Sequence, residues 1–230
     1  RKKGKLVLSS TIKFNILECL NRKVKPKYII IFLTIFSTDV EWANQYEMRN
    51  PQAPNGAHAN VLIYNTEDMS LERFDPNGVD TALHSDDLDI QLKNTFVKEF
   101  GKDFLKGGYH SPLDFCPLIG IQETQSSETD EVKGDTTGDP GGFCQAWTHW
   151  YITFRLKNPK LTRDEAINLS MKDLSENTGG ELTKFIRQYS LFIVTIKDTL
   201  MSSTSKEEAS DMIHEMIMKT RIEMLSISTP

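Results

Sequence analysis

Cys144 has the side chain and the local sequence that thiol chemistry requires. It follows Gly141 and Gly142 and opens a segment in which large aromatic residues recur at helical spacing. A thiol in the first turn of a helix faces the positive end of the helix dipole and unpaired backbone N–H groups, which both favour the thiolate. The two glycines let the backbone bend sharply beside it. The pattern therefore predicts Cys144 as a nucleophile.

His58 and Asp75 are spaced to serve that thiol. His58 stands at the start of an expected strand over residues 59–65, and Asp75 ends an expected partner strand over residues 70–75. The start of one hairpin strand lies beside the end of the next, so the carboxylate can reach the imidazole. Such a carboxylate fixes the tautomer and stabilises the imidazolium that forms when the base takes the thiol proton. We therefore expect His58 as general base and Asp75 as its orienting residue.

The remaining sequence predicts the elements that hold these residues. Apolar residues at helical spacing, with capping residues at several starts, predict helices over 11–21, 86–100, 143–158 and from about 162, 181 and 205. Apolar or β-branched runs predict a central strand over 28–36 and a short strand over 117–122, in addition to the hairpin. The expected fold class is α+β, with a small, mostly antiparallel sheet flanked by helices.

The chain divides by composition into a core and an extension. Residues 1–160 are expected to form the core, and residues 161–230 a helical C-terminal extension. Within the core, residues 123–142 consist largely of Ser, Thr, Gly, Asp and Glu. A segment with so few apolar side chains cannot contribute to a packed interior, so we expect an acidic loop insertion there.

Composition excludes several classes of function. The 230 residues carry a formal net charge of -5, which argues against a nucleic-acid-binding protein. The longest apolar run, residues 28–36, is far shorter than a membrane helix, and three cysteines without a CxxC pair favour a reducing, intracellular setting. Neither a phosphate-binding loop nor a metal-ligand spacing occurs, so no cofactor is expected. The chain begins with Arg1, as a fragment or processed product would.

These motifs resemble one known group of enzymes. The order His58, Asp75, a glutamine and then Cys144 resembles the clan of adenain and the SUMO-specific proteases. Within residues 28–160 the chain looks most similar to uncharacterised homologues of that clan in large DNA viruses. The segments that carry this similarity are His58–Ile63, Glu72–Gly78, Gly142–Trp147 and Arg155–Pro159.

The resemblance implies an adenain-like fold and a thiol peptidase or isopeptidase. Its substrate would be a polyprotein or a ubiquitin-like protein, cleaved after glycine, inside a host cell or in a virion. The resemblance also implies an oxyanion-hole glutamine ahead of the cysteine. Gln122 is the best match, with Gln125 and Gln145 as alternatives. The oligomeric state is not predicted.

Two other functions stay open at the level of sequence. Bacterial effector acetyltransferases resemble the same clan and share its order of histidine, carboxylate and cysteine. The other is an inactive module that binds a ubiquitin-like or capsid protein. It stays open because the chain departs from the clan's pattern at two points: Gln122 lies 22 residues before Cys144, and Ala59 instead of an aromatic residue follows His58. His149 is expected to be a surface or packing residue.

Overall fold

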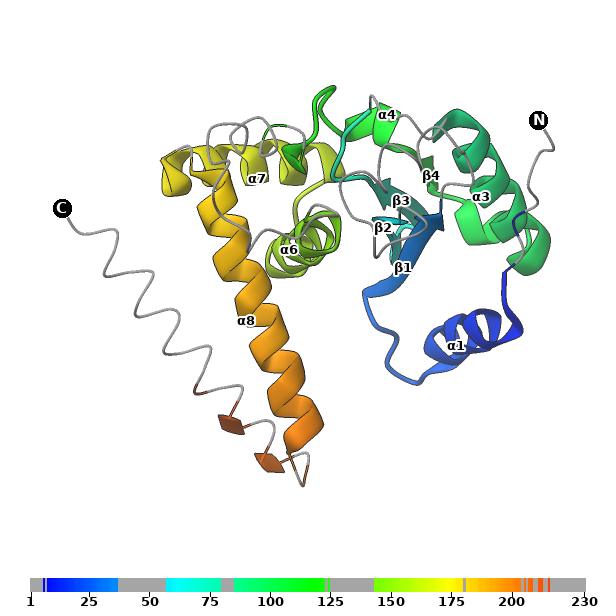
Figure 1. Cartoon of the computed structure of the whole chain (residues 1–230). Coiled ribbons are helices and arrows are strands. Elements are labelled where there is room, and N and C mark those ends of the chain that lie inside the picture. The colour runs from blue at the N-terminus through cyan, green and yellow to red at the C-terminus, as the bar shows by residue number, and fades with distance from the viewer. Residues whose placement is uncertain are drawn as a thin grey trace. The chain divides into compact units, whose positions relative to one another are not determined.

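A computed structural model describes residues 6, 8–36, 57–79, 85–122, 124, 143–179, 181–203 and six further positions up to 215 (Figure 1). The chain divides into two compact units, Arg1–Met171 and Lys172–Pro230. The predicted division into a core over residues 1–160 and an extension over 161–230 stays a prediction. The expected acidic loop over 123–142 lies, except for residue 124, outside the described residues.

The first unit contains a four-stranded mixed sheet. Its strands, in spatial order, are β1 (Tyr28–Phe36), β2 (Ala57–Asn65), β3 (Ser70–Phe74) and β4 (Gly108–His110). The pair β2–β3 is antiparallel, as the hairpin pattern predicted, and β1–β2 is antiparallel as well, whereas β4 pairs with β3 in parallel. The α+β class is confirmed. Within the described sheet, however, β1 is an edge strand and not a central one.

Several helices begin and end where the sequence predicted. They are α1 (Ser10–Asn21), α3 (Ser85–Phe100) and α6 (Cys144–Lys157). The helix α3 and the short turn η1 (Lys102–Leu105) form the crossover that a parallel β3–β4 pair requires. The strand predicted over 117–122 is wrong, because Ile121 and Gln122 are helical and the short helix α4 (Pro112–Phe115) precedes this segment.

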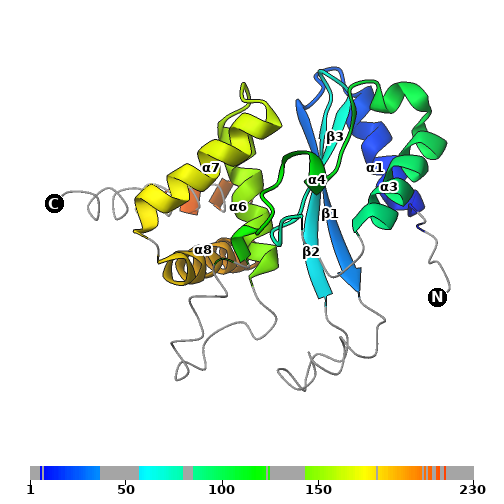
Figure 2. The same cartoon turned by 90° about the horizontal axis from the view of Figure 1, so that it is seen from above.

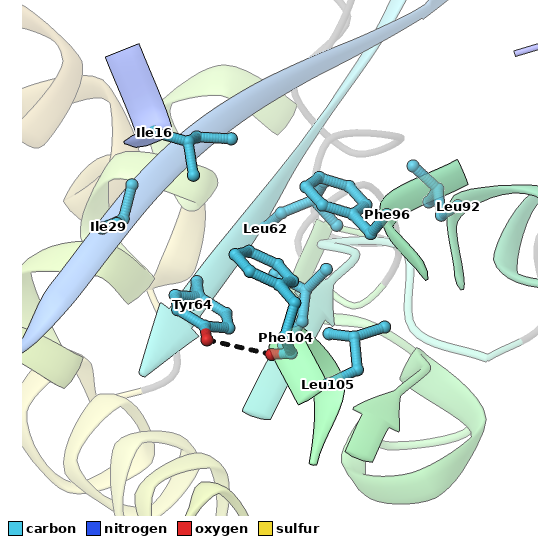
Figure 3. Close-up of a cluster of buried hydrophobic side chains, with 9 residues drawn as sticks. Ile16, Ile29, Leu62, Tyr64, Leu92, Phe96, Phe104 and Leu105 are labelled. Atoms are coloured by element: carbon cyan, nitrogen blue, oxygen red, sulfur yellow. Dashed lines mark hydrogen bonds between the residues drawn. The ribbon is translucent and has the colours of Figure 1, made fainter. Parts of the chain in front are cut away.

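One face of the sheet packs against α1 and α3. Alternate residues of β2, including Leu62 and Tyr64, point into this layer and contact Phe96 of α3 and Phe104 of η1 (Figure 3). The Tyr64 ring stacks on Phe104, and its hydroxyl donates to the Phe104 carbonyl at 2.9 Å. Figure 2 shows α1 and α3 on this side of the strands and α6 on the other. The sheet is therefore covered on both faces.

The helix α6 packs against the opposite face. Phe74 of β3 stacks on Tyr151 of α6 with ring centroids 4.0 Å apart, and Trp147 is completely buried. His149 is half-buried, and its ring lies 4.9 Å from that of Phe32. Burial of one side of α6 fixes the position of its first residue, Cys144.

Helices continue beyond α6. α7 (Arg163–Thr178) begins with a reciprocal cap, in which the Thr162 hydroxyl accepts from the Glu165 N–H at 3.3 Å and the Glu165 carboxylate accepts from the Thr162 N–H at 2.8 Å. α8 (Leu182–Ser202) lies in the second unit. Among the helices formed by the described residues, none is long and apolar enough to cross a membrane.

Candidate functional site

The turn after β3 fixes the Asp75 side chain. The Asp75 carbonyl accepts from the Gly78 N–H at 3.0 Å, and the Asp75 carboxylate accepts from the Asn77 N–H at 2.9 Å. Gly78 has φ of 78°, a conformation that glycine adopts without a steric penalty. The sequence Asp-Pro-Asn-Gly therefore forms the expected turn and holds one carboxylate oxygen in place.

His58 and Asp75 meet in the interior. The His58 Nε2 and the Asp75 Oδ1 are 2.6 Å apart, and both side chains are almost fully buried. Burial alone would raise the pKa of Asp75, but the hydrogen bond and charge of His58, with the Asn77 N–H and the Arg73 charge, together outweigh it, so the pKa lies below its usual value. Asp75 is therefore a carboxylate that fixes the orientation of the imidazole.

Cys144 completes this group of three residues. It is the first residue of α6, and its Sγ lies 3.4 Å from the Ala59 N–H on β2, beside His58. Burial lowers the pKa of His58, but contacts with the Asp75 and Cys144 side chains raise it more, to about 9. The imidazole is therefore placed and charged to interact with the Cys144 sulfur, as a base beside a nucleophilic thiol requires. We call His58, Asp75 and Cys144 the thiol site.

Gln122 is held next to the same turn. Its backbone N–H donates to the Pro76 carbonyl at 3.0 Å, and the Gly120 N–H donates to the Asn77 carbonyl at 3.1 Å. A Cβ on Gly120 would lie only 2.1 Å from the Asn77 carbonyl carbon, so only glycine permits this approach. The function of the Gln122 side chain stays a prediction. Of the alternatives, Gln145 is exposed on α6 and residue 125 lies outside the described residues.

Sequence reasoning missed Arg73 and Asp89. Arg73 is completely buried on β3 and donates to both carboxylate oxygens of Asp89 on α3, at 2.6 and 2.8 Å. The Arg73 Nη1 also donates to the second oxygen of Asp75 at 3.3 Å and to the Asn60 side chain. An arginine in a strand whose every residue is buried was the available signal, because a buried charge requires a partner.

The other cysteines lie in different environments. All three thiols are free, and burial raises the pKa of Cys116 to about 12. Cys19 is half-buried on α1. In the part of the chain that the structure describes, no cluster of His, Cys, Asp and Glu could hold a metal ion.

Comparison with known proteins finds similarity to a curated viral protein. No family model and no solved structure matches the chain. The chain is 31% identical over 164 residues to a protein of Acanthamoeba polyphaga mimivirus named "Putative ankyrin repeat protein L371". The match covers 66% of this chain but only 20% of the relative, so the chain spans about one fifth of the length of the protein it matches.

This comparison contradicts the predicted membership of the adenain and SUMO-protease clan. The relative is named as an ankyrin repeat protein, and no peptidase family matches. The predictions of a peptidase, of a hydrolase that processes ubiquitin-like proteins, and of an enzyme in general are wrong on the same finding. The physical reason is that cysteine, histidine and carboxylate recur in this arrangement on unrelated folds, so the three residues alone do not specify a family.

Proposed function

We propose that this chain is a protein-binding module of a longer protein and that it carries a reactive thiol. The name of the mimivirus relative supports the first part, because ankyrin repeats stack into extended surfaces that bind other proteins. This sequence has no internal repeat of about 33 residues, the ankyrin period. Its binding surface must therefore be built from other elements.

The observation that carries the proposal is a pair of exposed apolar residues on a fixed backbone. Leu118 is 69% exposed and Ile119 is 58% exposed. The backbone on both sides of them is bonded to the turn after Asp75: the Pro117 carbonyl accepts from the Val79 N–H at 3.1 Å, and the Gly120 N–H donates to Asn77. Such a segment loses little conformational entropy when a partner covers it. Leu118 and Ile119 are therefore the proposed contact surface.

The thiol site is the second part of the proposal. We infer that His58 is the base for the Cys144 thiol and that Asp75 orients the imidazole. We propose Gln122, whose backbone is bonded to the turn after Asp75, as a polar side chain that acts together with these three residues. The bound partner is a protein, with a ubiquitin-like or capsid protein as the finer proposal. Three unpaired cysteines support an intracellular setting, in a host cytoplasm or a virion.

A site-specific photo-crosslinker tests the contact surface. We expect a crosslinker at position 118 to capture one protein from an extract of the cells in which the chain naturally occurs. A crosslinker at Val24, which is 83% exposed, is the matched control. Ile119→Glu should abolish the adduct at 118, whereas Leu156→Glu on α6 should not. Equal capture at positions 24 and 118, or an adduct that survives Ile119→Glu, would contradict the proposal.

Alkylation tests the thiol site independently of any partner. Cys144 and Cys116 are equally buried, at 8% and 9% exposure, so a difference in their rates reports chemistry and not access. A thiol with a pKa of about 12 is almost entirely protonated at pH 7.5. We expect iodoacetamide to modify Cys144 at least ~100-fold faster than Cys116, measured by peptide mass spectrometry, and His58→Gln to remove most of that difference. Similar rates for the two cysteines would overturn the thiol site.

A further inference from the structure

Four buried charged side chains of alternating sign connect α3 to the Cys144 thiol. The Asp89 carboxylate contacts the Arg73 guanidinium, which contacts Asp75, and Asp75 in turn contacts His58. Cys144 lies at the other end, beside the imidazole. The four charged groups therefore alternate between negative and positive along the series. The series joins α3, β3, β2 and α6, which no local sequence pattern relates.

The distances show that Arg73 belongs mainly to Asp89. Two of its nitrogens lie 2.6 and 2.8 Å from the Asp89 oxygens, whereas its Nη1 lies 3.3 Å from the Asp75 Oδ2. Asp75 in turn makes its short contact, 2.6 Å, with His58. Each cation therefore has one carboxylate partner at short distance: Asp89 for Arg73 and Asp75 for His58. The charges of Arg73 and Asp89 largely cancel in their effect on Asp75.

We propose that Asp89 is a positioning residue of the thiol site, which it serves by neutralising Arg73 so that the Asp75 carboxylate is left to balance the charge of His58. This inference rests on the proposed thiol site. Without the negative charge of Asp89, the guanidinium would turn its full positive charge toward Asp75 and His58, and a nearby positive charge disfavours a protonated imidazole. The imidazolium would then share the Asp75 carboxylate with a second cation.

The surroundings of the series support this role. Tyr109 on β4 donates its hydroxyl to Asp89, and burial raises the pKa of that hydroxyl, so it remains a neutral donor. Asn60 accepts from Arg73, while its buried Nδ2 has no hydrogen-bond partner among the described residues. Arg73 is thus held by three groups besides Asp75: the two Asp89 oxygens and the Asn60 oxygen.

Few charged groups face the imidazole directly. Among the described residues, the titratable groups that act on His58 are Asp75, directly after β3, and Cys144, on α6. Asp75 is acted on by His58 and Arg73, and its backbone bonds the Cys116 thiol, which stays protonated. Asp89 is therefore connected to His58 by the contacts of Arg73 and Asp75, which makes the dependence testable.

The test follows the His58 ring by NMR in the full chain, with the signal assigned by its loss in His58→Gln. We expect its pKa to be about 9 in the unmodified protein and to fall by about one pH unit in Asp89→Asn. Asp87→Asn, which changes an exposed carboxylate on the same helix, should leave the pKa unchanged. The neutral pair Arg73→Gln with Asp89→Asn removes both charges and should restore the pKa to near its original value.

Each outcome has a distinct meaning. A His58 pKa near 6.5 in the unmodified protein would refute the thiol site itself, and with it this inference. A pKa near 9 that does not fall in Asp89→Asn would refute only the role of Asp89. If Asp89→Asn does not fold, the neutral pair still decides, because a low pKa in that variant would mean that neutralisation of Arg73 is not what sustains the imidazolium.

Discussion

Strand β3 carries one buried ion pair on each of its two faces, and the two pairs differ in the further groups that they contact. On the α6 face, Glu72 accepts from Arg155 at 2.8 and 3.2 Å, and Tyr151 adds a hydroxyl donor. On the α3 face, Arg73 pairs with Asp89. Consecutive residues of a strand point to opposite faces, so the two pairs face different layers. Glu72 and Arg73 thus each anchor a helix to the sheet.

We call the Glu72–Arg155 pair closed, because within the described residues neither partner forms a salt bridge with a further charged group. We call the Arg73–Asp89 pair open, because Arg73 also contacts Asp75. Among the described residues, Glu72 meets one cation, and Arg155 uses its remaining nitrogen on the Leu161 carbonyl at 3.0 Å. Arg73 instead continues to Asp75 and so to His58. A closed pair can only hold helix and sheet together, whereas an open pair also sets the charge of a titratable group.

The largest effect is expected from breaking the closed pair. Arg155→Leu leaves the Glu72 carboxylate buried without its cation, which typically costs 3–5 kcal/mol of unfolding free energy. Chemical denaturation measures this loss. Arg22→Leu is the control, because the Arg22–Glu18 pair is exposed on both sides and its removal should change stability by less than ~0.5 kcal/mol. The rate of Cys144 alkylation in the folded Arg155→Leu protein should stay unchanged, and a large fall in that rate would contradict the separation of roles.

The second largest effect is a pH dependence of the unfolding free energy, which we expect from His58, the titratable group to which the open pair connects through Asp75. The folded His58 has a pKa of about 9, above the ordinary value of 6.5. Its charge therefore stabilises the fold fully below pH 6.5, and this contribution is lost as pH rises through 9. We expect the unfolding free energy to fall by on the order of 2–3 kcal/mol between pH 6.5 and 9.5.

Denaturation curves across this pH range check that prediction against two variants. His58→Gln should flatten the dependence, because the titrating group is gone. His149→Gln is the control, because burial lowers the pKa of His149 and moves its titration below this pH range. An unchanged slope in His58→Gln would assign the dependence to another group. At low pH the sign reverses: the lowered pKa of Asp75 gives stability above the ordinary carboxyl value that is lost on acidification.

The sequence predicted the local parts of this arrangement and missed the long-range ones. The hairpin of β2 and β3, the turn after Asp75 and the start of α6 depend on neighbouring residues, so alternation, Asp-Pro-Asn-Gly and aromatic spacing were sufficient. Hairpin geometry also placed His58 beside Asp75. By contrast, β4 has three residues and its parallel pairing depends on a crossover that no local pattern encodes.

The segment from Pro117 to Gln122 shows why the strand predicted beside the site is wrong. Its apolar residues resembled a strand, but Leu118 and Ile119 are exposed and the segment bonds to a turn instead of a sheet. The close approach of Gly120 to Asn77 is a tertiary contact that a lone glycine in the sequence does not reveal. The pairing of Arg73 with Asp89 was not predicted for the same reason, because Asp89 lies on another element.

The smallest effect compares the two tyrosines that support the two pairs. Tyr151 donates to Glu72 at 3.3 Å, a long bond to a carboxylate that Arg155 already holds with two nitrogens, so Tyr151→Phe should cost about 0.5–1 kcal/mol. Tyr109 donates over a short distance to Asp89, and Tyr109→Phe should cost about 1–2 kcal/mol, because hydrogen bonds to charged groups are the stronger ones. Both variants keep every charge, so the His58 pKa and the Cys144 alkylation rate should stay as they are in the unmodified protein. If Tyr109→Phe instead lowers the His58 pKa as far as Asp89→Asn does, packing around Asp89 and not its charge controls the imidazole, and the two pairs on β3 differ less than their connections imply.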